Sequence, residues 1–462
     1  MKTKQSCFIL LINVVFFLHV FTGCNVSFDM SEPSISPEWA EPSDGPGYDD
    51  LVETDKLVLY IRQSNERVER RMINLFQQAY DVDVEIVTVS KEEYEERIIN
   101  DLAAGSGPDV IFLYEMFYTD IDKAALNHSF LDLTNVLAED PEFHKEDYLD
   151  GVFEACQHYG RQYVVPLSCE LPLVASIRSD LEELGFRWDG VDTMSDLLEE
   201  SVRVTPKAEV NSNFQQMFCS KNTFQRLLLF SSIPVINYET GEVLPDEKNF
   251  RDFLESYKLY FPYDYNEADR AMYHRALGYD VLTAGRCAFV FPRNMDGLPA
   301  TLSVLKNESY DYVIHSIPGQ TKESVGIVCG PVAINANSKN TLNAYRFIKF
   351  ILSETSQKDR YTIPDGMPIL KKALYDGLVN STGFTRGPGG NAMPDYEDRA
   401  FTEDEAEMIM ELITGTDRFV LNLSNEIIEM VCDTMLPFFQ NEASYEFCLN
   451  DLRSKLTFYL SE

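Results

Sequence analysis

The order of elements predicted for residues 56–113 constrains the fold of this chain more than any other feature of its sequence. Apolar runs in this stretch predict strands, and apolar residues spaced three or four positions apart predict helices between them. Ser90 and Glu93 form a capping box, which predicts the start of a helix. The predicted elements are a strand at 56–61, a helix at 68–80, a strand at 82–89, a helix from Ser90 to Gly105 and a strand at 109–113.

Strands that alternate with helices predict a parallel sheet. Each link between successive strands is long enough to hold a helix, and such crossovers cover both faces of a sheet. We therefore expect an α/β fold with a doubly wound sheet. Apolar runs at 288–292, 312–317 and 331–335 predict further strands, which we expect to complete this sheet.

Tyr114 and Glu115 directly follow the third predicted strand. In an open parallel sheet, ligands bind beyond the carboxyl ends of the strands. The aromatic ring and the carboxylate are therefore candidate recognition groups. The alternative is that Tyr114 covers the sheet edge and Glu115 is a solvated loop residue.

Length and charge limit the classes of protein to which the chain can belong. With 462 residues the chain is too long to fold around a single compact core, so two lobes are expected. The formal net charge of -36 repels phosphate backbones. We therefore exclude general nucleic-acid binding.

The N-terminus has the pattern of an export signal. Two lysines precede an apolar run at 8–21, which is shorter than the roughly 20 residues needed to span a bilayer. FTGC at 21–24 is similar to the bacterial lipobox, although Phe21 replaces its usual leucine. We expect residues 1–24 to be a lipoprotein signal peptide and Cys24 to be lipidated, for example with palmitate. Ordinary cleavage and an uncleaved anchor are the alternatives.

The segment 25–53 is rich in Ser, Pro, Glu, Asp and Gly and has no apolar period. This composition predicts a disordered tether between the membrane and the folded part.

The chain lacks the motifs that mark common catalytic and metal sites. Its seven later cysteines are widely spaced, without a CxxC or zinc pattern, and the histidines have no ligand spacing. HExxH, GxSxG, P-loop, EF-hand and GxGxxG motifs are absent from the sequence. We expect no enzyme activity, no catalytic residue, no cofactor and no metal; one disulfide among the seven cysteines remains an open alternative.

Short stretches of sequence along the whole chain resemble those of the extracellular solute-binding proteins of carbohydrate ABC importers, the type II periplasmic-binding family that includes maltose-binding protein. The matching stretches are FQQAYDVDVEIV at 76–87, YEERIINDLAAGSGPDVIFL at 94–113, DLTNVL at 132–137, RQYVVPLSCELPLVAS at 161–176, YVIHSIPGQ at 312–320, GPVAINANSKNTLNAYRFIKFILSETSQ at 330–357, DGMPILKKAL at 365–374 and YLSE at the end.

The resemblance implies two lobes, each a mostly parallel sheet flanked by helices, with the binding site between them. It implies three hinge crossings, near 164–170, 289–294 and 332–337. The first lobe would then comprise 54–166 plus 292–333, and the helix-rich second lobe 167–291 plus 334–462. It also implies a monomer that binds a small solute, works with the transmembrane subunits of an ABC permease, and is lipid-anchored on the extracellular face of a bacterial membrane, with Gram-positive origin favoured.

A sugar site needs flat aromatic faces and planar polar groups, because a buried unpaired hydrogen-bonding group costs about 1 to 3 kcal/mol. The resemblance places such groups in loops after the strands and in the crossings. Each candidate also has a structural reading, as a loop residue or an ion-pair partner. The candidates are Arg62, Ser64, Asn65, Tyr114, Glu115, Tyr118, Ser168, Glu170, Arg293, Asn294, Asp296 and Met367.

Three features leave the solute open. Trp39 lies in the predicted tether and Trp188 in a segment typical of a structural turn, so Tyr or Phe would have to supply the ring platforms. The Gly- and Pro-rich loop 385–399 is expected to be a plain surface loop; the alternatives are that it reaches the mouth of the cleft or contacts the transporter. A peptide or polyamine binder on the same fold, and a sensory or adhesive lipoprotein, are the alternatives.

Overall fold

The fold was analysed in a computed structural model. It describes residues 45–113, 121–208, 216–219, 223–238, 240–264, 282, 287–292, 298, 302, 305–306, 309–359, 362–363, 366–380, 401–421, 423 and 425–461. Gly45–Glu462 form one compact unit.

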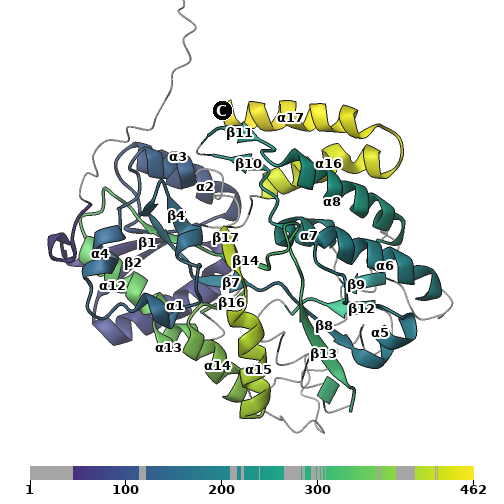
Figure 1. The fold of residues 1–462 in the computed structure, drawn as a ribbon. Coiled ribbons are helices and arrows are strands. Elements are labelled where there is room, and N and C mark those ends of the chain that lie inside the picture. Colours follow the sequence, from purple (N-terminus) through teal and green to yellow (C-terminus); the bar gives the residue numbers. More distant parts are fainter. Residues whose placement is uncertain are drawn as a thin grey trace, which may run out of the picture. The chain divides into compact units, whose positions relative to one another are not determined.

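A five-stranded sheet with the order β2-β1-β3-β15-β6 forms the first part of this unit (Figure 1). The first three strands are parallel, as the sequence predicts; β15 is antiparallel to both of its neighbours, β3 and β6, so β6 runs in the same direction as the first three. The strands are β1 (Lys56–Arg62), β2 (Asp83–Val89), β3 (Val110–Phe112), β6 (Val164–Val165) and β15 (Val332–Ile334).

Two predicted helices connect the parallel strands. Ser90 accepts a hydrogen bond from the Glu93 N–H at the start of α2 (Lys91–Ala103), so the predicted cap is confirmed. Phe76 of α1 (Glu66–Tyr80) is fully buried, and its ring lies 5.1 Å from that of Phe347 in α12 (Thr341–Leu352). These residues belong to the first core, whose buried members include Leu59, Phe76, Phe112 and Phe347.

Smaller elements complete this part of the chain. They are η1 (Tyr48–Asp50), η2 (Gln63–Asn65), α3 (Ile121–Leu126), α4 (Thr134–Glu139), η3 (Lys145–Asp147), η4 (Glu154–Cys156), β4 (Gln157–His158) and β5 (Arg161–Gln162).

A four-stranded sheet with the order β13-β8-β12-β9 forms the second part. β13, β12 and β9 run in the same direction, and β8 is antiparallel to its neighbours β13 and β12, so the sheet is mostly parallel with one reversed strand, as predicted. The helices around it bury the second core, whose members include Phe218, Phe250, Phe289 and Leu452. The strands are β8 (Leu173–Ile177), β9 (Gln216–Cys219), β12 (Cys287–Val290) and β13 (Tyr312–Ser316).

The helices of the second part come from two distant stretches of sequence (Figure 1). They and the small hairpin beside them are α5 (Arg178–Leu184), α6 (Met194–Ala208), α7 (Thr223–Ser231), β10 (Ile236–Asn237), β11 (Glu242–Val243), α8 (Glu247–Tyr260), η5 (Phe261–Tyr263), α16 (Asn425–Phe439) and α17 (Tyr445–Ser461).

A third sheet, which we call the linking sheet, has the order β16-β7-β14-β17. Its side chains contribute to both cores: Val328 belongs to the first core and Ile327 to the second. Its strands are β7 (Ser168–Glu170), β14 (Val325–Cys329), β16 (Met367–Pro368) and β17 (Arg418–Leu421), and α13 (Glu354–Gln357), α14 (Lys371–Asn380) and α15 (Glu403–Thr414) lie between them in sequence.

Two chain segments run from the five-stranded sheet into the linking sheet. Pro166 and Leu167 connect β6 to β7, and Gly330 and Pro331 connect β14 to β15. The first segment coincides with the predicted crossing at 164–170. The second lies before the predicted 332–337, because Val332 already pairs within the five-stranded sheet.

The predicted division into lobes needs correction at two places. β13 falls in the stretch 292–333 expected in the first lobe, but it pairs with β8 of the second sheet. Helix α12 falls in 334–462, expected in the second lobe, but its aromatic side chains pack against α1 in the first core.

The predicted tether is also too long. Residues 45–53 are folded onto the protein: Tyr48–Asp50 form η1, and the Val52 N–H donates to Thr341 Oγ1 at 2.8 Å. Composition alone predicted disorder, but tertiary hydrogen bonds hold this stretch.

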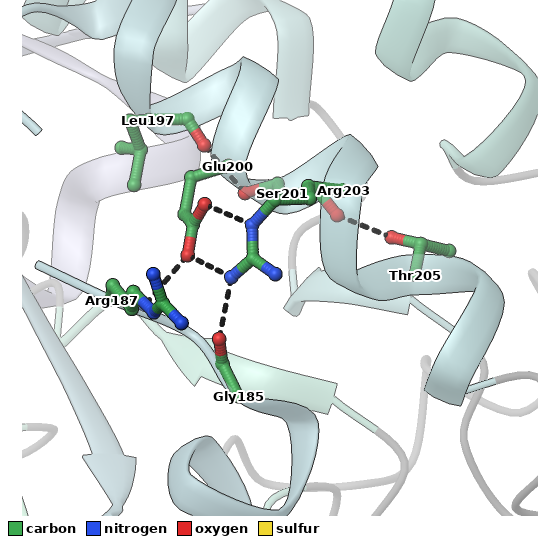
Figure 2. A network of polar contacts seen from close by, with 7 residues as sticks. All are labelled: Gly185, Arg187, Leu197, Glu200, Ser201, Arg203 and Thr205. Carbon is green, nitrogen blue, oxygen red and sulfur yellow. Dashed lines mark hydrogen bonds and ion pairs between the residues drawn. The ribbon is translucent and has the colours of Figure 1, made fainter.

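A polar network fixes the connection between α5 and α6 (Figure 2). The Glu200 carboxylate accepts from the Arg187 N–H at 2.7 Å and from the Arg203 guanidinium. Arg203 also donates to the Gly185 carbonyl, which lies just after α5. The network therefore holds the start of the turn against the middle of α6.

Candidate functional site

Half of the predicted site residues fall where the structure can be described. Tyr114, Glu115, Tyr118, Arg293, Asn294 and Asp296 lie outside the described residues, as does the predicted lipidation site Cys24. The six that can be placed are Arg62, Ser64, Asn65, Ser168, Glu170 and Met367.

Three of these lie at the carboxyl end of β1: Arg62 is its last residue, and Ser64 and Asn65 follow it. The Arg62 N–H donates to the Glu69 carboxylate at 3.2 Å, and this carboxylate is buried. Ser64 and Asn65 lie in η2, where the Ser64 hydroxyl donates to Asn65 Oδ1 at 3.1 Å in an exposed position. The end of β1 therefore offers Ser64 and Asn65 as accessible polar groups.

Arg62 also contributes charge to the interior of the first core. Burial raises the pKa of Tyr94 well above its usual value, the charge of Glu69 raises it further, and the positive charge of Arg62 opposes that rise. The Tyr94 hydroxyl donates to the Phe112 carbonyl at 3.2 Å. These interactions place Arg62 near buried polar groups, which favours the structural reading of this residue.

The other three residues come together in the linking sheet. Met367 pairs with Cys169, and Ser168 pairs with both Pro368 and Cys329. Met367 is fully buried and Ser168 is 2% exposed, so neither side chain is presented at the surface. Ser168 lies in β7, inside the sheet, whereas Met367 lies in the edge strand β16 and is buried in the first core.

Glu170 ends β7 and forms the most distinctive polar contact of the candidate site. Its carboxylate accepts from Arg226 Nη1 of α7 at 2.9 Å, and the two side chains are 15% and 11% exposed. The Arg226 guanidinium also lies 5.5 Å from the centre of the Phe291 ring, just after β12. Arg226 thus connects the end of β7 with the end of β12.

Sequence reasoning did not identify Arg226. The available signal was one charged residue close to the apolar run of α7, where Leu227, Leu228 and Phe230 are buried. Helix α7 follows β9, whose carboxyl end lies next to that of its parallel neighbour β12. Position beyond the carboxyl ends of parallel strands is the usual location of ligand sites in such sheets.

Aromatic residues near this point are already used in packing. Phe291 stacks on Phe230 with 6.3 Å between ring centres and 9° between planes. Trp188 stacks on His315 at 4.1 Å, which confirms its structural role. Burial and, to a smaller extent, the charge of Arg178 together lower the pKa of His315 to about 4, so the imidazole is neutral at pH 7.

The described residues do not assemble a metal centre: they contain no group of three or more His, Cys, Asp or Glu side chains placed to hold an ion. The cysteines that can be assigned, Cys156, Cys169, Cys287, Cys329, Cys432 and Cys448, are free thiols. No helix within the described part of the chain is long and apolar enough to cross a membrane.

Comparison with known families identifies the class of protein. Residues 71–383 match the sequence model of a family described as bacterial extracellular solute-binding protein. The match covers more than half of the chain, and the chain therefore belongs to the bacterial extracellular solute-binding proteins. The comparison with curated protein sequences gives no match.

Solved structures share the fold at low sequence identity. The sugar-binding protein MalE from Xanthomonas citri has a TM-score of 0.63 and 14% identity, over 88% of this chain and 97% of its own. A family 1 extracellular solute-binding protein from Alicyclobacillus acidocaldarius has a TM-score of 0.58 and 12% identity, over 89% and 99%. An ABC substrate-binding protein from Listeria monocytogenes, in complex with cycloalternan, has a TM-score of 0.55 and 15% identity, over 88% and 99%. These similarities establish the two-lobe fold of MalE-like proteins.

Proposed function

We propose that this chain is a membrane-tethered, extracellular substrate-binding protein of an ABC importer. It captures a sugar or oligosaccharide between its two lobes, closes around it and delivers it unchanged to the permease. Cys24 carries the lipid, residues 25–44 are the free tether, and the protein acts as a monomer without a cofactor.

The linking sheet is the observation that carries this proposal. Its strands β7 and β14 continue into the five-stranded sheet through Pro166 and Pro331, which have no N–H to donate to a ladder. Gly330 has a φ of +58°, in the left-handed region that glycine tolerates best. The two neighbouring chain segments, β6 to β7 and β14 to β15, are therefore interrupted at the same point along the sheet. They can bend at this point while both cores stay intact.

Closure requires contacts from both sides of the hinge, because a ligand with equal affinity for the open and closed arrangements does not shift the equilibrium between them. Ser64 and Asn65 supply polar groups from the five-stranded sheet. Glu170 and Arg226 supply charged groups from the linking sheet and α7. Planar carboxylate and guanidinium groups hydrogen-bond efficiently to sugar hydroxyls.

The charge balance at Glu170 favours a neutral solute over a polyamine. A polyamine needs carboxylates to match its ammonium groups, and Glu170 already pairs with Arg226 at 2.9 Å. The descriptions of several structural neighbours name a bound carbohydrate, including cycloalternan and maltotetraose. Both facts support a sugar, and they are independent of each other.

A thermal-shift screen tests the proposal. The purified protein is heated with maltose, maltotetraose, cycloalternan, spermidine or a tripeptide, and a ligand present at 100 times its dissociation constant should stabilise the fold by about 2.7 kcal/mol. We expect a shift with a carbohydrate and none with spermidine. A shift with spermidine or the peptide alone would establish a non-sugar binder, and no shift in a broader screen would favour a sensory or adhesive role.

Two controls complete the screen. Replacing Tyr114 and Glu115 together by alanine should remove the carbohydrate shift while the unliganded melting temperature stays within about 2 °C, a change of less than about 1 kcal/mol. Incubation with a chromogenic glycoside should release no product. Product release would identify the chain as an enzyme and contradict the proposal.

A further inference from the structure

Residues 45–55 precede β1 and have the sequence GPGYDDLVETD. Nothing in this composition predicts order, and chain termini are usually poorly ordered unless specific contacts hold them. In this protein the segment lies along two helices that are distant from each other in sequence, α4 and α12.

The first part of the segment contacts the α4 region. Asn135 Nδ2 donates to the Gly45 carbonyl at 2.9 Å, and the Tyr48 N–H donates to Glu139 Oε2 at 2.9 Å. A Cβ atom at Gly45 would lie 2.9 Å from Asp132 Oδ2, and one at Gly47 would lie 2.5 Å from Glu139 Oε2. Glycine at these two positions therefore allows the side chains of α4 and of the turn before it to approach the backbone.

The second part of the segment caps the start of α12. The Leu342 N–H donates to the Val52 carbonyl at 2.8 Å, and the Val52 N–H donates to Thr341 Oγ1 at 2.8 Å. The first N–H groups of a helix have no partner within the helix, so an outside acceptor such as Val52 satisfies one of them. The Thr54 N–H donates to Asn340 Oδ1 at 3.0 Å.

Side chains add to these backbone contacts. The Tyr48 ring lies 5.8 Å from that of Tyr345 in an edge-to-face arrangement, and Tyr48 and Leu51 pack against the first core. Arg346 pairs with Glu53 at 2.7 Å, with both groups partly exposed. The segment is therefore held along its whole length, by backbone, aromatic and charged groups.

We propose that residues 45–55 are a strap that fastens the N-terminal tether to the part of the molecule that contains the five-stranded sheet. This inference rests on the proposed tether. The free tether then consists only of residues 25–44, with a maximum reach of about 70 Å. Tension on the tether is resisted at α4 and α12, so the part built on the second core carries no attachment and is free to swing during closure.

Limited proteolysis tests where the tether ends. A glutamyl endopeptidase cuts after Glu38 in the tether and after Glu53 in the strap, and mass spectrometry distinguishes the two products. In the full chain we expect cleavage after Glu53 to be at least tenfold slower than cleavage after Glu38. Equal rates at the two sites would contradict the strap.

Hydrogen exchange tests the contacts themselves. Thr341→Val removes the acceptor of the Val52 N–H and should speed exchange of that amide at least tenfold. Thr457→Val is a matched control, because Thr457 lies on α17 and its hydroxyl donates to the Arg453 carbonyl. The control should leave the exchange of Val52 unchanged.

A pair of segment replacements tests the boundary. Full-length chains in which 46–53 or, as a control, 33–40 is replaced by Gly and Ser keep the same length. Only the first should speed exchange of the Leu342 N–H tenfold or more and lower the melting temperature. No effect of either replacement would refute the strap, and an equal effect of both would refute the boundary at Gly45. No solute is needed, so failure of the carbohydrate screen would leave these results interpretable.

Discussion

Two acid–base pairs in this protein have the same chemistry and very different surroundings. Asp140 and Lys349 lie 3.0 Å apart in the first part of the molecule, where the Asp140 side chain is 1% exposed. Glu170 and Arg226 lie 2.9 Å apart at the junction of the linking sheet and α7, where both side chains retain some exposure. The first pair lies within one packed region, and the second lies where chain segments from different sheets meet.

Their partners differ as well. Asp140 also accepts from the Tyr345 hydroxyl at 2.8 Å and from the Glu142 N–H at 2.9 Å. Burial by itself would raise the pKa of Asp140, but these hydrogen bonds and Lys349 lower it below its ordinary value. The Asp140 carboxylate is 1% exposed and has several donors, so we expect it to contribute stability, whereas the Glu170 carboxylate is 15% exposed. Under the proposed function the two pairs therefore differ in role: the first stabilises the fold and the second contributes to solute binding.

The largest expected effect is the loss of the Asp140 carboxylate. Asp140→Ala should lower the free energy of unfolding by about 3 kcal/mol, because Lys349 loses its buried partner and the Tyr345 hydroxyl loses its acceptor. Urea denaturation of the unliganded protein measures the change. Asp140→Asn, which keeps an acceptor oxygen, should cost less; a loss below about 0.5 kcal/mol in both variants would show that this pair is not structural.

The second effect concerns binding and not folding. Glu170→Gln should weaken the binding of the carbohydrate that responds in the thermal-shift screen by about tenfold, equal to about 1.4 kcal/mol. The variant should change the free energy of unfolding less than Asp140→Ala does. Isothermal titration with that carbohydrate measures the affinity. The matched control Glu200→Gln removes a carboxylate of similar exposure on α6 and should leave affinity unchanged. A fall in stability without a fall in affinity would mean that Glu170 has a structural role and does not contribute to binding.

The sequence predicted the elements that local patterns determine. The strands and helices from β1 to β3 and the Ser90 cap are confirmed, because apolar period and cap chemistry are properties of neighbouring residues. The resemblance supplied the family and the two-lobe fold. Short-range patterns were thus sufficient for local structure.

Long-range pairing was the part that could not be predicted. β13 has the same apolar pattern as a strand of the five-stranded sheet, and only its pairing with β8 assigns it elsewhere. The order of residues 45–53 depends on acceptors in α4 and α12 that lie 91 and 289 positions away. Arg226 was missed for the same reason: its partner Glu170 is 56 residues earlier in the chain.

A third, smaller effect follows from the pKa of Asp140. Because the folded-state pKa is below that of the unfolded chain, the stabilisation is fully present above the unfolded value near 3.9 and is lost as pH falls through the folded value. Wild type and Asp140→Asn should therefore differ in unfolding free energy at pH 7, and the difference should shrink as pH falls below about 4. Urea titrations at several pH values measure the difference. A constant gap across this range would mean that charge at Asp140 does not stabilise the fold.

The smallest effect should come from a pair that is neither buried nor near the linking sheet. Arg203 is 42% exposed and pairs with Glu200 in the network of Figure 2, where its hydrogen bonds lower the pKa of Glu200. Arg203→Ala should cost only about 0.5 kcal/mol, because the guanidinium is 42% exposed and Glu200 keeps its hydrogen bond from the Arg187 N–H when Arg203 is removed. Arg203→Lys, which keeps the charge but not the two-pronged geometry, should cost about as much if geometry rather than charge matters here. A loss in unfolding free energy near that of Asp140→Ala would show that exposure does not determine how much these ion pairs contribute to stability. Arg203 would then stabilise the turn through its hydrogen bond to the Gly185 carbonyl and not through its charge.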